Sequence, residues 1–120
     1  MKLNLKDTFN QELPADTNTE NRVRQVSNAA FSYVTPRIPG KPSVIHVSPQ
    51  MLEAVGLTEA DAKSEEFLNV FSGKEIYPET KPYAIAYAGH QFGNWAGQLG
   101  DGRAINLFEV NHNDKQWALQ

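Results

Sequence analysis

Glycines and one arginine are the residues of this sequence whose spacing best fits a chemical role. Residues 89–110, GHQFGNWAGQLGDGRAINLFEV, contain five of the eight glycines in the chain. The run Gly100-Asp101-Gly102 lies between two extended segments and predicts a tight turn, because glycine tolerates the positive φ that such turns require. A turn with two glycines also leaves backbone N–H groups unshielded, and such a loop can lie over the phosphates of a nucleotide.

Arg103 follows this turn directly and adds forked, permanently charged donors that suit phosphate oxygens. A charge-assisted hydrogen bond of this kind contributes about 1.5–3 kcal/mol. The stretch is neither a Walker motif nor a Rossmann fingerprint, because a strand and not a helix is expected after it. The residues alone therefore leave two interpretations open: a hairpin that contacts phosphate, or a purely structural hairpin.

The other side chains that could do chemistry give weaker signals. No spacing among the three histidines, His46, His90 and His112, is typical of a metal site. Aromatic side chains near the glycines, Phe92 and Trp95, are expected to pack against the protein, with stacking on a base as the alternative. A carboxylate in the last third of the chain, Glu109, is expected to be solvated. No nucleophile–base arrangement or carboxylate pair is recognisable.

Composition and charge place the chain among ordinary globular proteins. It has 120 residues, 40% of them hydrophobic and 21% charged, with a formal net charge of −3 and no cysteine. This length fits one domain. The absence of a basic patch argues against nucleic acid and acidic membranes as partners, and no signal peptide or membrane span is recognisable. We expect a cytoplasmic protein.

The elements around the glycine-rich stretch predict an α+β fold. Residues 1–20 look like a partly flexible leader, and residues 43–48, SVIHVS, alternate as a short strand. Two helices follow. The first begins at Ser48 and ends at Gly56, and the second begins at Thr58 or Ser64 and ends at Gly73, with Phe67, Leu68 and Phe71 as its buried stripe.

An antiparallel β-meander is expected after the helices. Residues 81–89 predict a buried strand or short extended piece. The next strand runs to about Leu99 and pairs across residues 100–102 with a strand over 103–110, so that a glycine-rich hairpin occupies residues 94–110. A second turn at residues 111–114 leads into a strand that begins at Lys115.

A longer segment of the sequence bears on whether the glycine-rich hairpin contacts phosphate or is purely structural. Residues 87–104, YAGHQFGNWAGQLGDGRA, resemble the signature of the selenoprotein O family, also called YdiU or UPF0061 proteins. The upstream segments FSYVTPRIPGKPSVIHVSPQMLEAVGL and FLNVFSGKEIYPETKPYAIAYAGHQFG are also similar to that family. The resemblance covers roughly residues 21–120.

The resemblance implies a protein-kinase-like fold that binds ATP in a flipped orientation and transfers AMP to Ser, Thr or Tyr hydroxyls of other proteins. ATP and Mg²⁺ or Mn²⁺ are then the expected cofactors, and protein substrates the expected partners. Gly100, Gly102 and Arg103 inherit the ATP-contacting role, and Asp101 sets the geometry of the loop.

Family members are several times longer than this chain, and their further nucleotide-binding, catalytic and metal-binding residues are expected downstream. Residues 21–120 are therefore interpreted as an incomplete N-terminal lobe, inactive on its own, which could self-associate through its open sheet edge. Two alternatives stay open: a small α+β partner-binding or structural module without a nucleotide role, and an ordinary kinase-like phosphotransferase.

Overall fold

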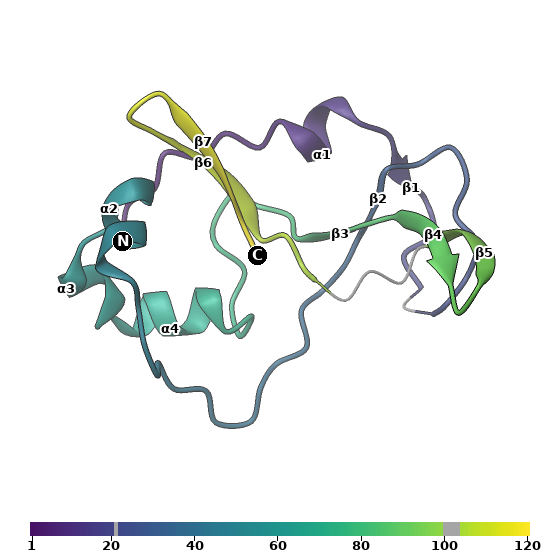
Figure 1. Cartoon of the computed structure of the whole chain (residues 1–120). Helices are drawn as coiled ribbons and strands as arrows, with labels where there is room; N and C mark the ends of the chain where they lie inside the picture. Colours follow the sequence, from purple (N-terminus) through teal and green to yellow (C-terminus); the bar gives the residue numbers. More distant parts are fainter. Residues whose placement is uncertain (21, 100–103) are drawn as a thin grey trace.

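The computed structural model describes residues 1–20, 22–99 and 104–120. Its elements are, in chain order, α1 (Phe9–Glu12), β1 (Ala15–Asp16), β2 (Phe31–Tyr33), α2 (Pro49–Val55), α3 (Glu59–Ala62), α4 (Glu65–Phe71), β3 (Tyr83–Ile85), β4 (Tyr87–Gln91), β5 (Asn94–Leu99), β6 (Phe108–His112) and β7 (Lys115–Leu119) (Figure 1). The fold is α+β with short helices and mainly antiparallel strands, as the sequence predicts. No helix among the described residues is long and apolar enough to cross a membrane.

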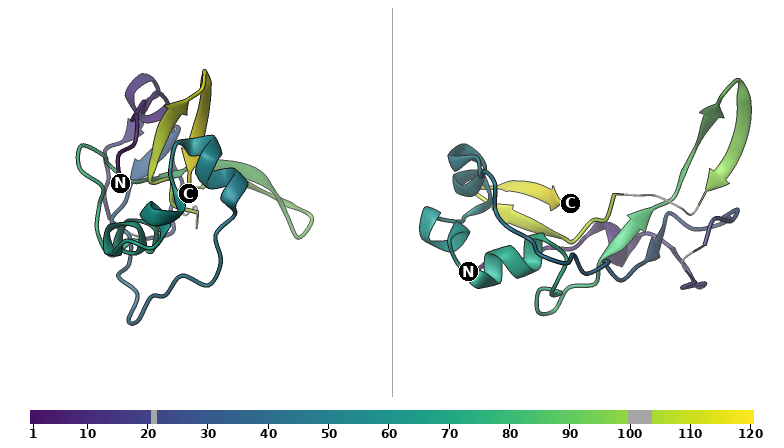
Figure 2. Two further views of the ribbon diagram at one scale, coloured as in Figure 1. Left: turned by 90° about the vertical axis from the view of Figure 1, so that its left-hand side faces the viewer. Right: turned by 90° about the horizontal axis from the view of Figure 1, so that it is seen from below.

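The strands form three small sheets in place of one continuous meander. The first has the order β1-β2-β3, with β1 parallel and β3 antiparallel to β2, while β4 pairs with β5 and β6 with β7. The β4–β5 hairpin projects from the body of the molecule (Figure 2). Three of the helices, α2, α3 and α4, gather at the opposite end, below β6 and β7 in Figure 1, whereas α1 lies near β1.

The helices begin at residues whose side chains can cap an N-terminus, and α2 ends at a glycine. Ser48 Oγ accepts from the Met51 N–H, Pro49 occupies the first helical position, and Gly56 ends α2 with a φ of 82°. Both alternative starts of the second helix are used. Thr58 forms a capping box at α3, and Ser64 Oγ accepts from Phe67 N at α4, so two short helices replace one.

The prediction of a strand over residues 43–48 is wrong. Residues 42–48 form no strand, and Ile45 is 97% exposed. Alternation predicts a half-buried strand only where a neighbour supplies backbone partners, and this proline-rich connector runs directly into the cap of α2. Two strands that the sequence does not predict are β1 and β2, and β2 is held between β1 and β3.

Two groups of buried side chains hold the described elements together. The larger packs α2 and α4 against β6 through Leu52, Val55, Leu57, Val70, Phe108 and Val110. The second is aromatic: Phe31 lies 5.1 Å from Tyr83 between ring centroids, and Phe9 stacks on Tyr83 at 5.4 Å. The helical stripe expected at Phe67, Leu68 and Phe71 is only half-buried, and the most buried apolar residue of α4 is Val70.

Residues 1–8 lie beside β6. Leu5 forms an antiparallel bridge with Val110, and the Lys6 N–H donates to the Glu109 carbonyl oxygen at 2.8 Å. The division of the chain into a leader over 1–20 and an incomplete lobe over 21–120 stays a prediction.

Candidate functional site

The predicted nucleotide loop, Gly100, Asp101, Gly102 and Arg103, lies outside the described residues. What the structure describes are the two stems from which this loop starts and to which it returns. The first stem is the end of β5, and the second is the segment from residue 104 into β6 (Figure 1).

The stems do not form the hairpin expected over residues 94–110. Among the described residues, β5 pairs with β4 and β6 pairs with β7. Each pair is closed by a two-residue turn with positive φ at both positions, Phe92-Gly93 (51° and 82°) and Asn113-Asp114 (50° and 60°). Such turns match the twist of adjacent strands. They therefore favour pairing of β4 with β5 and of β6 with β7. The Phe92-Gly93 turn is the signal that the sequence analysis missed.

The first stem is held by residues 25–29. The Val26 N–H donates to the Gln98 carbonyl oxygen at 2.9 Å, and Gln98 Nε2 donates to the Ala29 carbonyl oxygen at 2.6 Å. Gln25 forms a bridge with Leu99, and its Nε2 donates to Ala96 O at 3.1 Å. The end of β5 is therefore fixed by both backbone and side-chain bonds.

Gly97 makes this close approach of Gln25 feasible. Its φ is 73°, and a Cβ built at this position would lie 2.5 Å from Gln25 Oε1. The backbone conformation therefore favours glycine, and a larger residue would also displace the Gln25 side chain.

The second stem is buried beside β3. Tyr83 and Asn106 exchange two backbone bonds, with the Tyr83 N–H donating to Asn106 O at 3.0 Å and the Asn106 N–H donating to Tyr83 O at 2.8 Å. Tyr83 is 1% and Asn106 5% exposed. Burial, reinforced by the charges of Glu109 and Asp7, raises the pKa of the Tyr83 hydroxyl to about 12. Tyr83 anchors the stem through its two backbone bonds to Asn106, and its buried hydroxyl stays protonated.

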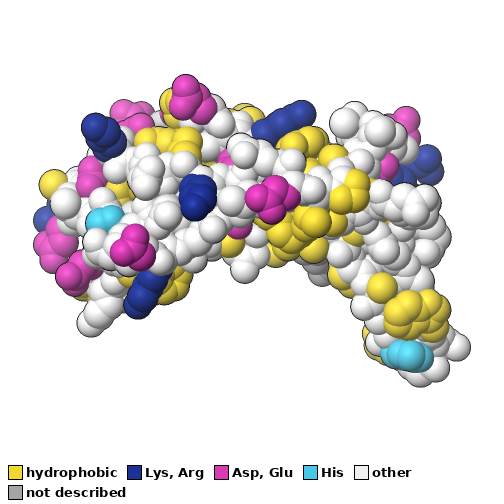
Figure 3. Space-filling model, turned by 90° about the horizontal axis from the view of Figure 1, so that it is seen from above, with side chains coloured by type: hydrophobic (Ala, Val, Ile, Leu, Met, Phe, Trp, Pro, Cys, Tyr) yellow, Lys and Arg dark blue, Asp and Glu magenta, His cyan; other side chains and the backbone are white. Residues whose placement is uncertain are grey.

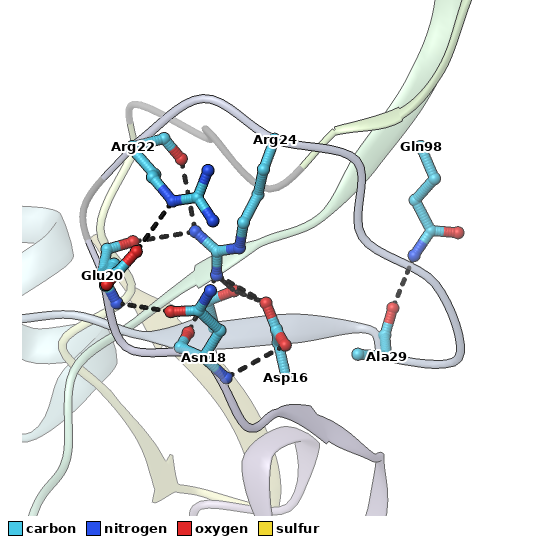
Figure 4. A network of polar contacts seen from close by, with 8 residues as sticks. Asp16, Asn18, Glu20, Arg22, Arg24, Ala29 and Gln98 are labelled. Carbon is cyan, nitrogen blue, oxygen red and sulfur yellow. Dashed lines mark hydrogen bonds and ion pairs between the residues drawn. The ribbon is translucent and has the colours of Figure 1, made fainter.

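Arg24 organises the chain just before the first anchor (Figure 4). Its Nη2 donates to the Asp16 carboxylate and to Asn18 O, while Nη1 donates to Glu20 O and Arg22 O. Hydrogen bonding from Arg24 lowers the pKa of Asp16. This guanidinium is thus engaged by the protein itself, and it fixes the segment that leads to residues 25–29. The spacing of Arg24 and Asp16 in the sequence gives no sign of this pairing.

The three histidines do not lie together at one site. His90 and His46 are exposed, and His112 lies over Gly56. Within the described ranges, no group of three His, Cys, Asp or Glu side chains is placed to hold a metal ion. We therefore assign no described residue to Mg²⁺ or Mn²⁺.

Two expectations about single side chains are wrong. Phe92 and Trp95 do not pack into the described part of the protein: Phe92 is fully exposed and Trp95 is 62% exposed at the tip of the β4–β5 hairpin, where a two-residue turn carries them away from the body. Glu109 is not simply solvated. Its Oε2 accepts from the backbone N–H groups of Thr8 and Phe9 at 2.6 and 2.9 Å, because the leader lies across β6.

Comparison with known proteins identifies the family. Residues 14–119 match the family described as Protein adenylyltransferase SelO. Proteins named Protein nucleotidyltransferase YdiU are 59% identical over 118 residues in Flavobacterium johnsoniae, 44% over 119 in Methylobacillus flagellatus and 46% over 121 in Aromatoleum aromaticum. These matches cover 97–98% of this chain and 23% of each relative. The resemblance inferred from residues 87–104 is confirmed: the chain belongs to the SelO family of protein adenylyltransferases.

Proposed function

We propose that the complete protein transfers AMP from ATP to Ser, Thr or Tyr hydroxyls of other proteins, and that residues 100–103 bind the phosphates of ATP. The observation that carries this proposal is the family match over residues 14–119, which includes the GDGR segment. The chain spans 23% of the length of the relatives, so the activity is proposed for the complete protein and not for these 120 residues alone.

The chemistry of the loop residues supports this role. Backbone N–H groups at Gly100 and Gly102 have no side chain to shield them from an anion, and Arg103 supplies a permanent positive charge. We propose that Asp101 sets the geometry of this loop. Together these groups would orient the triphosphate so that a substrate hydroxyl attacks the α-phosphorus and pyrophosphate leaves. Mg²⁺ or Mn²⁺, when bound, would neutralise phosphate charge.

The anchored stems give the loop a defined origin. One stem is bonded to residues 25–29 and the other to Tyr83, so the two ends of the proposed phosphate loop start from fixed backbone. Preorganised donors contribute more to transition-state stabilisation than donors that must first be ordered. We also propose that the α+β arrangement around these stems is part of a protein-kinase-like N-terminal lobe.

Labelled ATP tests the proposal directly. The complete protein is incubated with a protein substrate and ATP labelled at either the α- or the γ-phosphate. Transfer of the α-label alone supports AMP transfer. Transfer of the γ-label would instead identify an ordinary kinase-like phosphotransferase and refute the proposal.

A variant pair tests the role of the loop. Arg103→Ala should weaken ATP binding by about tenfold or more while the melting temperature stays unchanged, since a charge-assisted bond contributes about 1.5–3 kcal/mol. Arg37→Ala, which removes an exposed arginine elsewhere, is the matched control. A lower melting temperature of the Arg103 variant with unchanged ATP binding would support the structural-module alternative.

A further inference from the structure

The tip of the β4–β5 hairpin is an aromatic surface without a partner among the described residues. Phe92 is fully exposed and Trp95 is 62% exposed, and the ring of His90 lies edge-on to Trp95 with 5.3 Å between centroids. Figure 3 shows hydrophobic and histidine surface side by side at the end of this projection. Large aromatic side chains gathered at one exposed point mark an interaction site more often than isolated exposed apolar residues do.

The hairpin also lacks the usual protection of a free sheet edge. Residues 82–99 contain no Asp, Glu, Lys or Arg. Strands that face solvent are commonly guarded by charged side chains, proline or a covering element. Beyond the Ala86–Ala30 backbone bond at its base, no described strand pairs with the outer side of β4. Tyr87, near that base, is 41% exposed. The composition of the hairpin therefore fits a surface that another protein segment covers.

We propose that the Phe92–Trp95 tip docks into an apolar cleft on the remaining part of the SelO-family chain. The chain accounts for 23% of the length of its relatives, so the complete protein offers a large additional surface. Because residues 82–99 contain no Asp, Glu, Lys or Arg, apolar contact and not charge attraction would drive this docking.

The size of the tip favours a segment of the same chain over a second copy. Two aromatic side chains bury roughly 300–500 Å². Two tips packed against each other would thus bury roughly 600–1,000 Å² in total, less than the about 1,200 Å² at which stable interfaces between separate proteins begin. Within one chain the same area is sufficient, because tethering gives an effective concentration in the millimolar range.

Cysteine labelling tests the docking without relying on enzymatic activity. The chain has no cysteine, so Phe92→Cys introduces one reporter thiol. Its rate of reaction with a neutral maleimide is measured in the 120-residue chain and in a complete protein, made by placing residues 1–120 in the matching segment of the Flavobacterium johnsoniae relative. Peptide mapping assigns the label to position 92. Lys63→Cys, at an exposed residue of the helical end, is the control.

Docking predicts that position 92 reacts at least about tenfold more slowly in the complete protein, while position 63 reacts equally in both. Trp95→Cys provides a second position if the first substitution disturbs the turn. Equal rates at both tip positions would overturn the proposal. Slow labelling of the 120-residue chain that depends on its own concentration would overturn it too, since the occupant would then be a second copy. The docking proposal rests on the labelling rates alone. If the complete protein did not transfer AMP, these rates would be unaffected, so the docking proposal and the proposed function are tested independently.

Discussion

Gly97 offers the sharpest test of how the first stem of the candidate loop is held. An alanine at this position would keep a φ of 73°, which costs about 1–2 kcal/mol for a residue with a Cβ. The new Cβ would lie 2.5 Å from Gln25 Oε1, so the Gln25 side chain must move and give up its bond to Ala96 O, at a cost of about 1 kcal/mol. Gly97→Ala should therefore weaken the attachment of β5 to residues 25–29 by about 2–3 kcal/mol.

Amide hydrogen exchange measures this attachment locally. The Val26 N–H donates to Gln98 O, so its protection reports opening between β5 and residues 25–29. A loss of 2–3 kcal/mol corresponds to an about 30- to 160-fold decrease in the protection of Val26. Global unfolding in urea is the accompanying measurement, because it separates local opening from loss of the whole fold.

Substitutions at two other glycines of the same hairpin distinguish the backbone cost of a positive φ from the cost of displacing Gln25. Gly93 has a φ of 82° with nothing within 4 Å of its Cβ position, so Gly93→Ala carries only the backbone cost. Gly89 has neither the positive φ nor a close neighbour, so Gly89→Ala should be nearly neutral. Gln25→Ala in the Gly97→Ala background should add little, because the bond that it removes is already lost. Equal effects of Gly93→Ala and Gly97→Ala, or full additivity of Gln25→Ala, would refute the role assigned to Gln25.

Three further changes test the contacts around the stems. Glu109→Gln should lower the free energy of unfolding by about 1–2 kcal/mol, since a neutral amide accepts more weakly from the Thr8 N–H; an unchanged urea midpoint would contradict this. Asp7→Asn should stabilise the protein at neutral pH, because burial raises the pKa of Asp7 in the folded state and ionisation there opposes folding. The gain in the free energy of unfolding from Asp7→Asn should be complete above that raised pKa and vanish as pH falls below the ordinary value of 3.8. A stability difference between variant and parent that stays constant across a pH series would contradict this prediction. Arg24→Lys should cost about 1–2 kcal/mol in urea unfolding, because an ammonium cannot reproduce the forked donors toward Asp16 and the backbone, and a neutral outcome would show that the network contributes only charge.

The elements that the sequence predicts well are those fixed by local chemistry. Ser48, Thr58 and Ser64 cap their helices through their own hydroxyl groups, and Gly56 ends α2 in the left-handed region. The strand beginning at Lys115 follows the Asn113-Asp114 turn as expected. Each of these features depends on residues within four positions of one another, so a single sequence contains all the information that they need.

What the sequence does not predict depends on distant partners. Residues 43–48 have the right alternation for a strand but no neighbour to pair with, whereas β2 forms from a short segment because β1 and β3 lie on both sides. The contacts of Glu109 with Thr8 and Phe9 join residues a hundred positions apart. For the same reason the family resemblance led to residues 100–103, whereas the anchors at residues 25–29 and at Tyr83 required the structure.

The two hairpins give the proposed phosphate loop an unusual dependence on the rest of the protein. Its stems belong to different sheets, each closed by its own turn, and no described ladder joins β5 to β6. At its base, the β4–β5 hairpin is bonded to residues 25–29, which places the end of β5 relative to the rest of the protein. A contact at Phe92 and Trp95 would attach the hairpin at its far tip as well as at that base. Under the ATP-binding role proposed for residues 100–103, docking of the tip would add a second restraint on the first stem, beyond the one that residues 25–29 already provide.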